Sequence, residues 1–267
     1  MSSPTGPTPP PPMYSASVPP SAPEPAGPGL SEPQRLVNVF IAPSKTFEDL
    51  KRNPSWWVPW LVTAIFLVIF GAVAVQKIDI ARFIQQQIEK SPSAQRRMEQ
   101  LTPEQRERGI AMQATGTKVV FYIYPVFTLV GGLVIAAVLM AVFNFMLGAE
   151  VPFQRAMAVV FYSFVPLIIS TVLLTVSLLA SSDPNTIDLT NPMPTNPGFF
   201  MDPQGNKFIY AIISSLDIFS IWVVTLLGLG FAKASSNRKP SVSTGITTMF
   251  VVFAIFVLGR AAWRSLF

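Results

Sequence analysis

The chain has 267 residues, of which half are hydrophobic and only 12% are charged, about half the charged fraction usual in a soluble domain. It contains neither cysteine nor histidine, which excludes disulfides, thiolate or imidazole metal sites, and catalysis by a thiol or an imidazole. The net charge of +5 does not indicate nucleic-acid binding, because the basic residues flank apolar blocks, where they orient membrane helices. Composition therefore predicts an integral membrane protein.

Residues 1–31 form a proline-rich segment that has no basic residue and no apolar run of signal-peptide length. Prolines remove amide donors and favour extended polyproline II conformations, so this segment is predicted to be a disordered tail. The spacings Pro4-x-x-Pro7 and Pro7-x-x-Pro10 leave a second interpretation open, in which the tail docks into an aromatic groove of another protein.

Residues 32–55 are predicted to form two short amphipathic helices on the membrane surface. Ser31-x-x-Gln34 has the spacing of a capping box at the start of the first helix, and Pro43 ends that helix. Its apolar side chains are expected at the boundary of the lipid headgroups: Leu36, Val39, Phe40 and Ile41.

The second short helix is predicted to start at Ser44 or Thr46, with Thr46-x-x-Asp49 as its capping box. Basic and aromatic side chains around this helix are the expected anchors to lipid headgroups and to the membrane interface. Together with a tryptophan near the end of the chain, the interface anchors are Lys45, Lys51, Arg52, Trp56, Trp57, Trp60 and Trp263.

Five apolar blocks approach or exceed the length of helix that crosses about 30 Å of hydrocarbon. Unpaired backbone groups are too costly in lipid, and the blocks are continuous rather than alternating, so helices are predicted rather than barrel strands. The predicted fold is all-α, a polytopic membrane domain over 56–267 with five transmembrane helices. The spans are expected at about residues 57–75, 119–147, 156–180, 209–232 and 243–263.

Two features inside these spans predict how the helices pack. Pro166 is expected to kink the third span, because proline removes a backbone donor and its ring clashes with the preceding turn. Gly131 and Gly132 are expected to let a neighbouring backbone approach the second span closely.

Residues 76–118, between the first two spans, are predicted to form an amphipathic helical insert. Ser91-Pro92 and Thr102-Pro103 each resemble a helix cap followed by a proline at the first helical position, and Thr102-x-x-Gln105 has the spacing of a capping box. Two or three helices are expected, and the sequence leaves open whether they lie on the membrane or fold into a small subdomain outside it.

Asp217, with Ser214 and Ser215, is the candidate polar site of the membrane domain. If the fourth span starts near Ile209, the Asp217 carboxylate lies about 12 Å into the membrane, where an ionisable group suggests a proton, ion or substrate site. Ser214-x-x-Asp217 also has capping-box spacing, so Ser214 can instead cap a helix whose first turn holds Asp217. The sequence leaves both interpretations open.

No catalytic, cofactor or metal site is expected. Without histidine there is no Ser–His dyad and no zinc-binding helix, and the spans supply no second aspartate for an aspartyl dyad. The glycines in the spans lie inside apolar helices, where they do not form a phosphate-binding loop.

The distribution of Lys and Arg gives the orientation only ambiguously. With five spans, the face that carries the N-terminal segment collects eight of the 19 basic residues and the opposite face collects eleven, eight of them in residues 76–118. The positive-inside rule favours a cytoplasmic N-terminus only if that insert is left out. The side on which the insert lies therefore stays open.

Three stretches carry a family resemblance. LVNVFIAPSKTFEDLKRNPSWWVPW (36–60), FQRAMAVVFYSFVPLI (153–168) and SLDIFSIWVVTLLGLGFA (215–232) resemble the Yip domain family, the Ypt/Rab-GTPase-interacting five-span membrane proteins, in its prokaryotic branch. The similarity covers about residues 34–267. It implies a five-helix membrane domain in the bacterial cytoplasmic membrane, with a cytoplasmic N-terminus and the C-terminus across the membrane.

We therefore expect a membrane-embedded, scaffold-like interaction or organising component without catalytic activity. Its expected partners are the lipid bilayer and another membrane protein or a second copy of itself, contacted through partner helices or lipids, and not nucleic acid. A GTPase partner is implied only by analogy with the eukaryotic relatives. The alternative is a small transporter or channel component that uses Asp217 as an intramembrane carboxylate.

Overall fold

The computed structural model describes residues 28–236 and 240–266, which form α-helices and two short 3-10 turns without a strand. Residues 1–27 of the predicted tail lie outside the described residues. In chain order the elements are α1 Glu32–Ile41, α2 Pro43–Asp49, α3 Trp57–Lys77, α4 Ile80–Glu89, α5 Pro92–Glu99, α6 Pro103–Leu147, α7 Phe153–Ser163, α8 Leu167–Ala180, η1 Pro184–Thr186, η2 Pro197–Phe200, α9 Lys207–Ser215, α10 Ile218–Ala234 and α11 Val242–Leu266.

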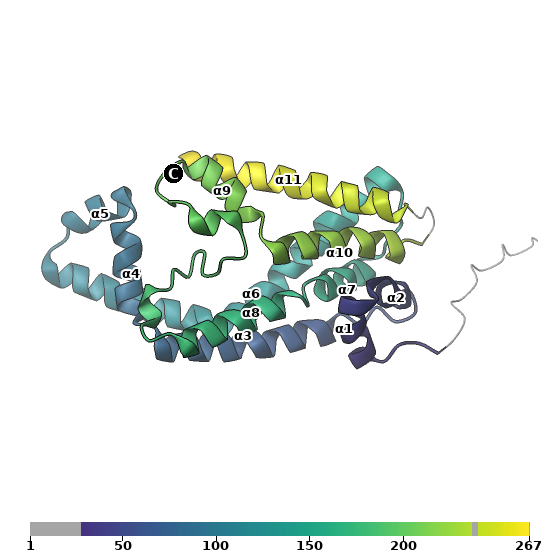
Figure 1. Cartoon of the computed structure of the whole chain (residues 1–267), viewed down its shortest axis with the longest axis horizontal. Helices are drawn as coiled ribbons and strands as arrows, with labels where there is room; N and C mark the ends of the chain where they lie inside the picture. Colours follow the sequence, from purple (N-terminus) through teal and green to yellow (C-terminus); the bar gives the residue numbers. More distant parts are fainter. Residues whose placement is uncertain (1–27, 237–239, 267) are drawn as a thin grey trace, which may run out of the picture.

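The long helices run along the long axis of the molecule, with α1 and α2 at one end and α4 and α5 at the other (Figure 1). Within the described residues, four helices are long and apolar enough to cross a bilayer, and the bent pair α9–α10 makes a fifth if it counts as one span. This confirms the predicted all-α polytopic membrane fold. With the pair counted as one span the number of crossings is odd, and α1 and the end of α11 lie at opposite ends of the molecule, as Figure 1 shows.

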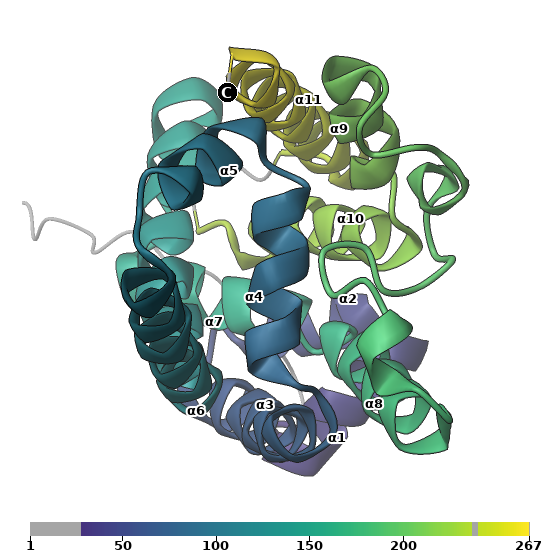
Figure 2. The same ribbon diagram turned by 90° about the vertical axis from the view of Figure 1, so that its left-hand side faces the viewer.

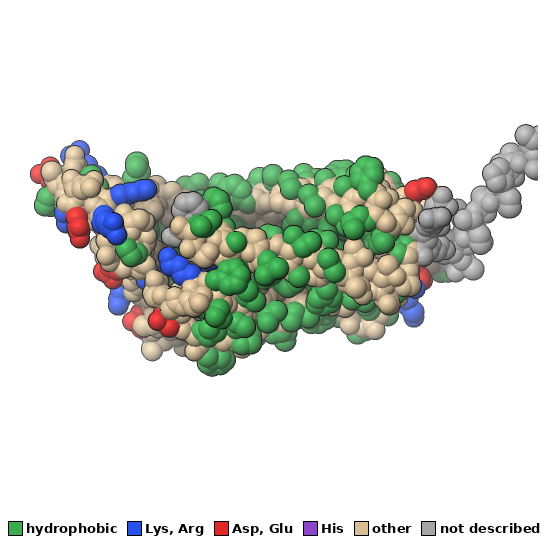
Figure 3. Space-filling view, turned by 90° about the horizontal axis from the view of Figure 1, so that it is seen from above, with side chains coloured by type: hydrophobic (Ala, Val, Ile, Leu, Met, Phe, Trp, Pro, Cys, Tyr) green, Lys and Arg blue, Asp and Glu red, His purple; other side chains and the backbone are tan. Residues whose placement is uncertain are grey.

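The surface is apolar between the two charged ends of the molecule. In Figure 3 hydrophobic side chains cover the middle of the visible face, while Lys, Arg, Asp and Glu gather toward the ends. Ile65 of α3 and Ile255 and Phe256 of α11 are each more than half exposed. A surface of this kind is stable in hydrocarbon and not in water.

The helix α6 is much longer than the span predicted for it. Its 45 residues reach about 68 Å, more than twice the hydrocarbon thickness, so the helix extends beyond the apolar belt. Thr102 and Gln105 form the expected capping box at its start. The insert therefore consists of α4, α5 and the first turns of α6.

The insert is attached to the end of the helix bundle by its own small core. Figure 2 shows α4 lying across this end. Ile80 and Ile84 of α4 are buried together with Ala74 of α3 and Ala114 of α6. Ser91 caps α5 as predicted, with Pro92 in the first turn.

Two of the predicted spans are broken helices. The third is interrupted between α7 and α8 at Pro166, where the sequence predicts a kink. The fourth consists of α9 and α10, which are bent by 60° relative to each other. Each break brings backbone amides and carbonyls out of the regular helical pattern, so side chains and loops are needed to bind them.

The helices α10 and α11 approach each other at two glycines. A Cβ at Gly228 would lie 2.5 Å from the Cα of Ile246, and one at Gly245 would overlap the carbonyl oxygen of Gly228. In the second span the predicted approach of a neighbouring backbone is wrong: Gly132 faces the side-chain ring of Phe161, and Gly131 has no neighbour within 4 Å.

We expect Gly228→Ala to destabilise the protein by about 1–3 kcal/mol, because the added methyl forces the two helix backbones apart. Gly131→Ala is the control: it makes the same gain in helix propensity and its methyl group meets open space, so it should not destabilise the protein. Thermal unfolding of both variants in detergent micelles measures the difference. Equal melting temperatures for the two variants would contradict the close packing of α10 on α11.

Candidate functional site

The bend between α9 and α10 contains the predicted polar site. Asp217 is the N-cap of α10, and its Oδ1 accepts hydrogen bonds from the backbone amides of Phe219, at 2.9 Å, and Ser220, at 3.1 Å. The prediction that Ser214 caps this helix is wrong, because α9 continues through Ser215 and the chain turns only at Leu216. The capping role proposed for this region therefore belongs to Asp217 itself.

The other carboxylate oxygen of Asp217 is also used. Its Oδ2 accepts a hydrogen bond from the hydroxyl of Thr195, and the carbonyl oxygen of Thr195 accepts one from the amide of Ile218 at 3.1 Å. Thr195 lies in the long loop that connects α8 with α9, and sequence analysis did not identify it. No local pattern links it to Asp217, because 22 residues separate the two.

The two serines of the predicted site point to different partners. Ser215 is buried, and its hydroxyl donates to the carbonyl oxygen of Ala211 at 2.7 Å and accepts from the Arg260 guanidinium at 2.8 Å. The hydroxyl of Ser214 reaches only the same carbonyl oxygen of Ala211, at 3.4 Å. The structure therefore adds Arg260 of α11 to this site, and places Ser214 at its edge.

The loop over this bend is held by amide side chains. The Asn196 amide is buried and donates to the Oδ1 of Asn191 at 2.7 Å, and Asn191 donates to the hydroxyl of Tyr210 at 3.3 Å. These bonds fix the loop that carries Thr195 against α9. The arrangement is a hydrogen-bonded helix break whose carboxylate has partners on both oxygens.

A second polar cluster, which sequence analysis missed, joins α1 to α2. Arg35 is only 2% exposed, and its guanidinium binds Asp49 through Nε at 2.8 Å and Nη2 at 2.7 Å, and Glu32 through Nη1 at 3.1 Å. Burial is the largest single effect and lowers the pKa of Arg35, but the hydrogen bond and charge of Asp49, together with the charge of Glu32 and the nearby Tyr162, hold the pKa above its usual value.

This cluster continues into the membrane helices. The hydroxyl of Tyr162, a fully buried residue of α7, donates a hydrogen bond to the other oxygen of Glu32. The hydroxyl of Thr46 donates to the carbonyl oxygen of Arg35 at 3.0 Å. We call α1 and α2 the N-terminal helix pair, and this network is its polar link to α7.

The helix pair differs from its prediction in two ways. The helix α2 begins at Pro43 with Ala42 as its cap, so Thr46 and Asp49 do not form a capping box but bind α1. Val39 is fully buried in the protein core instead of lying among lipid headgroups. The capping box of Ser31 and Gln34 is confirmed.

Apolar contacts also attach the helix pair to α10. Phe47 is fully buried, and a Cβ at Gly230 of α10 would lie 3.0 Å from its ring. The ring of Phe40 packs edge-on against that of Trp222, with 5.7 Å between centroids. Lys233 of α10 forms an exposed ion pair with Glu48 at 2.8 Å.

The predicted interface anchors lie in different environments. Trp56 packs against Phe161 with 5.8 Å between ring centroids, and the Trp60 indole donates to the carbonyl oxygen of Pro125 at 3.2 Å. Trp57 and Trp263 are more than half exposed. Of the basic anchors, Lys45 and Arg52 are exposed and Lys51 is half-buried. Their anchoring role stays a prediction.

We expect Asp217→Ala to destabilise the protein by about 1–2 kcal/mol, because it removes the cap of α10 and the partner of Thr195. Asp217→Asn should cost much less, since an amide oxygen still accepts from the two capping amides. Ser214→Ala is the control and should have almost no effect. Thermal unfolding in micelles ranks the three variants, and a loss for Ser214→Ala as large as that for Asp217→Ala would contradict the capping role of Asp217.

Comparison with known proteins identifies the family. The sequence matches the model of the Yip1 domain over residues 37–261. The membrane protein YknW of Bacillus subtilis (strain 168) is 22% identical over 228 residues, which cover 85% of this chain and 90% of that protein. No solved structure matches the chain. Because the family model spans most of the chain, the resemblance seen in the sequence is confirmed, and the protein belongs to the Yip1 domain family of multi-pass membrane proteins.

Proposed function

We propose that this protein is a scaffold-like interaction component that organises partner helices or lipids in the cell membrane, without catalytic activity of its own. The N-terminal helix pair is the contact surface in this proposal, and a second membrane protein or another copy of the chain is its partner. The observation that carries the proposal is the buried network of Arg35, Asp49, Glu32 and Tyr162, which fixes the helix pair to the membrane helices.

Burying an ion pair costs desolvation free energy, which is offset only when the two groups are held in a good hydrogen-bonding geometry. Replacing such a pair by apolar residues often leaves stability unchanged or raises it, whereas removing one partner leaves an uncompensated charge. The Arg35–Asp49 pair therefore supports a helix pair held in one defined position. A partner that binds this surface is then held at a defined position relative to α7 and α10, which the helix pair contacts.

The outer face of the helix pair suits an apolar partner. Val37 is 56% exposed and Ile41 is 74% exposed, on the side of α1 that faces away from the core. Beside them is a shallow hollow of about 270 Å³, lined by Pro33, Gln34, Val37 and Asn38. Apolar residues four apart on a fixed helix are the contacts that a partner helix typically makes.

We also propose a cytoplasmic N-terminus, which places the helix pair at the cytoplasmic end of the spans. Lys45 and Arg52 are exposed at this end, where the anionic lipids of the inner leaflet attract basic side chains. A partner at this surface then meets the protein at the level of the headgroups and not in bulk water.

Crosslinking in native membranes tests this surface. The chain has no cysteine, so Val37→Cys and Ile41→Cys each introduce one thiol for a photoreactive probe. We expect both positions to give a discrete protein adduct, because they lie on the proposed contact face. Met112→Cys is the exposed control on α6, far from the helix pair, and should give none.

A second variant tests whether the fixed position of the helix pair matters. Asp49→Asn removes the negative charge that faces the buried Arg35, so the adduct at Ile41→Cys should become weaker when the two changes are combined. If the positions 37 and 41 give only lipid adducts, or the same proteins as the position 112, the proposed contact surface is wrong.

The alternative, a transporter or channel component, rests on the bend at Asp217. Carriers often bind their ions at broken membrane helices, which is what α9 and α10 form. Both oxygens of Asp217 accept hydrogen bonds from the protein, which favours a structural role. Ion flux into proteoliposomes is measured for the unaltered protein and for Asp217→Asn, and we expect no difference between them. If the unaltered protein conducts ions and the folded Asp217→Asn variant does not, the result would instead support transport.

A further inference from the structure

A large cavity lies at the end of the molecule opposite the N-terminal helix pair. Its volume is about 520 Å³, within the range of small-molecule sites. The walls come from four separate segments: the α4–α5 turn, the loop that contains Asp188, the start of α9, and the end of α11. The cavity exists only because the fold brings these segments together.

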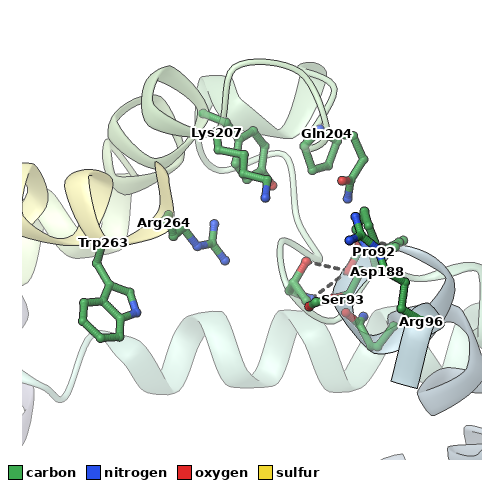
Figure 4. Close-up of a pocket in the computed structure, with 14 residues that line it drawn as sticks. Pro92, Ser93, Arg96, Asp188, Gln204, Lys207, Trp263 and Arg264 are labelled. Atoms are coloured by element: carbon green, nitrogen blue, oxygen red, sulfur yellow. Dashed lines mark hydrogen bonds and ion pairs between the residues drawn. The ribbon is translucent and has the colours of Figure 1, made fainter. Parts of the chain in front are cut away.

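The cavity collects positive charge. Lys90, Arg96, Lys207 and Arg264 line it, against a single carboxylate, that of Asp188. Figure 4 shows Lys207 and Arg264 extending toward the cavity from α9 and α11, opposite the segments that carry Asp188 and Arg96.

The single carboxylate neutralises only part of this charge. Asp188 binds the Lys90 ammonium at 2.9 Å, and Lys90 is the one member of the four that is in an ion pair among the described residues. Partial burial would raise the pKa of Asp188, but hydrogen bonds from Lys90 and Thr190 outweigh it and lower the pKa. Asp188 therefore stays charged and holds Lys90 at the wall, while three further cations face the same hollow.

A neutral hydrogen-bond donor and two aromatic side chains complete the lining of the cavity. The hydroxyl of Ser93 can donate to an anion, whereas the hydroxyl of Thr190 already donates to Asp188, and the buried Tyr210 and the exposed Trp263 form apolar parts of the wall. Several cations around a hollow of this size match a ligand with a spread negative charge and more than one acceptor oxygen. A phosphate group carries both, and a chloride ion would leave most of the volume unused.

From this constellation we propose that the cavity binds a phosphate-bearing anion, with Arg96, Lys207 and Arg264 as the charged contacts. The site lies at the end of α11, beyond the apolar belt, and this position corresponds to the level of the lipid headgroups. The cavity is therefore open both to lipid headgroups and to the aqueous solution. An anionic phospholipid headgroup and a soluble phosphate thus share the chemistry that the site recognises. The site is remote from the helix pair and does not depend on the function proposed for that surface.

The test uses the full chain, purified in a neutral detergent. Three probes are titrated: short-chain phosphatidylglycerol, short-chain phosphatidylcholine of the same length, and inorganic phosphate. The cavity variant combines Arg96→Gln, Lys207→Gln and Arg264→Gln. The control variant combines Arg97→Gln, Arg108→Gln and Lys118→Gln, three exposed bases outside the cavity, so both variants lose the same charge.

Of the two anionic probes, phosphatidylglycerol and inorganic phosphate, we expect the one that the unaltered chain binds more tightly to bind the cavity variant at least about tenfold more weakly than the control variant, because three charge-assisted contacts are lost. The affinity of the unaltered chain should fall as salt is added. Phosphatidylglycerol bound more tightly than phosphate supports a lipid headgroup, and equal binding of both supports a soluble phosphate.

Two results would overturn the proposal. One is an unaltered chain that binds neither anionic probe more tightly than phosphatidylcholine. The other is an equal loss of binding in the cavity and control variants, which would mean that only net charge matters. The melting temperatures of both variants are measured in the absence of ligand, and the single variant Arg264→Gln replaces the triple one if the latter is unfolded.

Discussion

In hydrocarbon an unpaired backbone amide or carbonyl has no water to bind, and at two connections between the membrane helices side chains bind these backbone groups. At the bend between α9 and α10, Asp217 binds two amides of the next helix. Between α6 and α7, the Asn144 side chain binds both the amide and the carbonyl of Val151. Polar residues near the spans therefore have a structural use before any functional one.

The two ends of the molecule differ in how their charged side chains are paired. At the N-terminal end the buried Arg35 is paired with Asp49 and Glu32, so that end is a packed and electrostatically satisfied element. At the opposite end Asp188 pairs with Lys90, and further cations remain around a cavity. A satisfied cluster holds a surface in place, while an excess of one charge attracts a ligand of the other sign.

Local sequence patterns predicted what local physics controls. The capping boxes at Ser31 and Thr102 and the break at Pro166 follow from contacts within a few residues, and the structure confirms them. Thr46 and Asp49 have the same local spacing, yet they bind Arg35 of the preceding helix. A buried guanidinium is a stronger partner for a carboxylate than a backbone amide is, so the tertiary contact replaced the local one.

The sequence by itself determined the all-α membrane fold, the absence of cysteine and histidine chemistry, and the family, because hydropathy, composition and local motifs are properties of short stretches. Only the tertiary structure decided which polar residues meet. Tyr162 is 130 positions from Glu32, and Arg260 is 45 from Ser215. The basic cavity is likewise made by four separate segments of the chain. Contacts over such separations depend on how the helices pack, and no spacing within one helix encodes them.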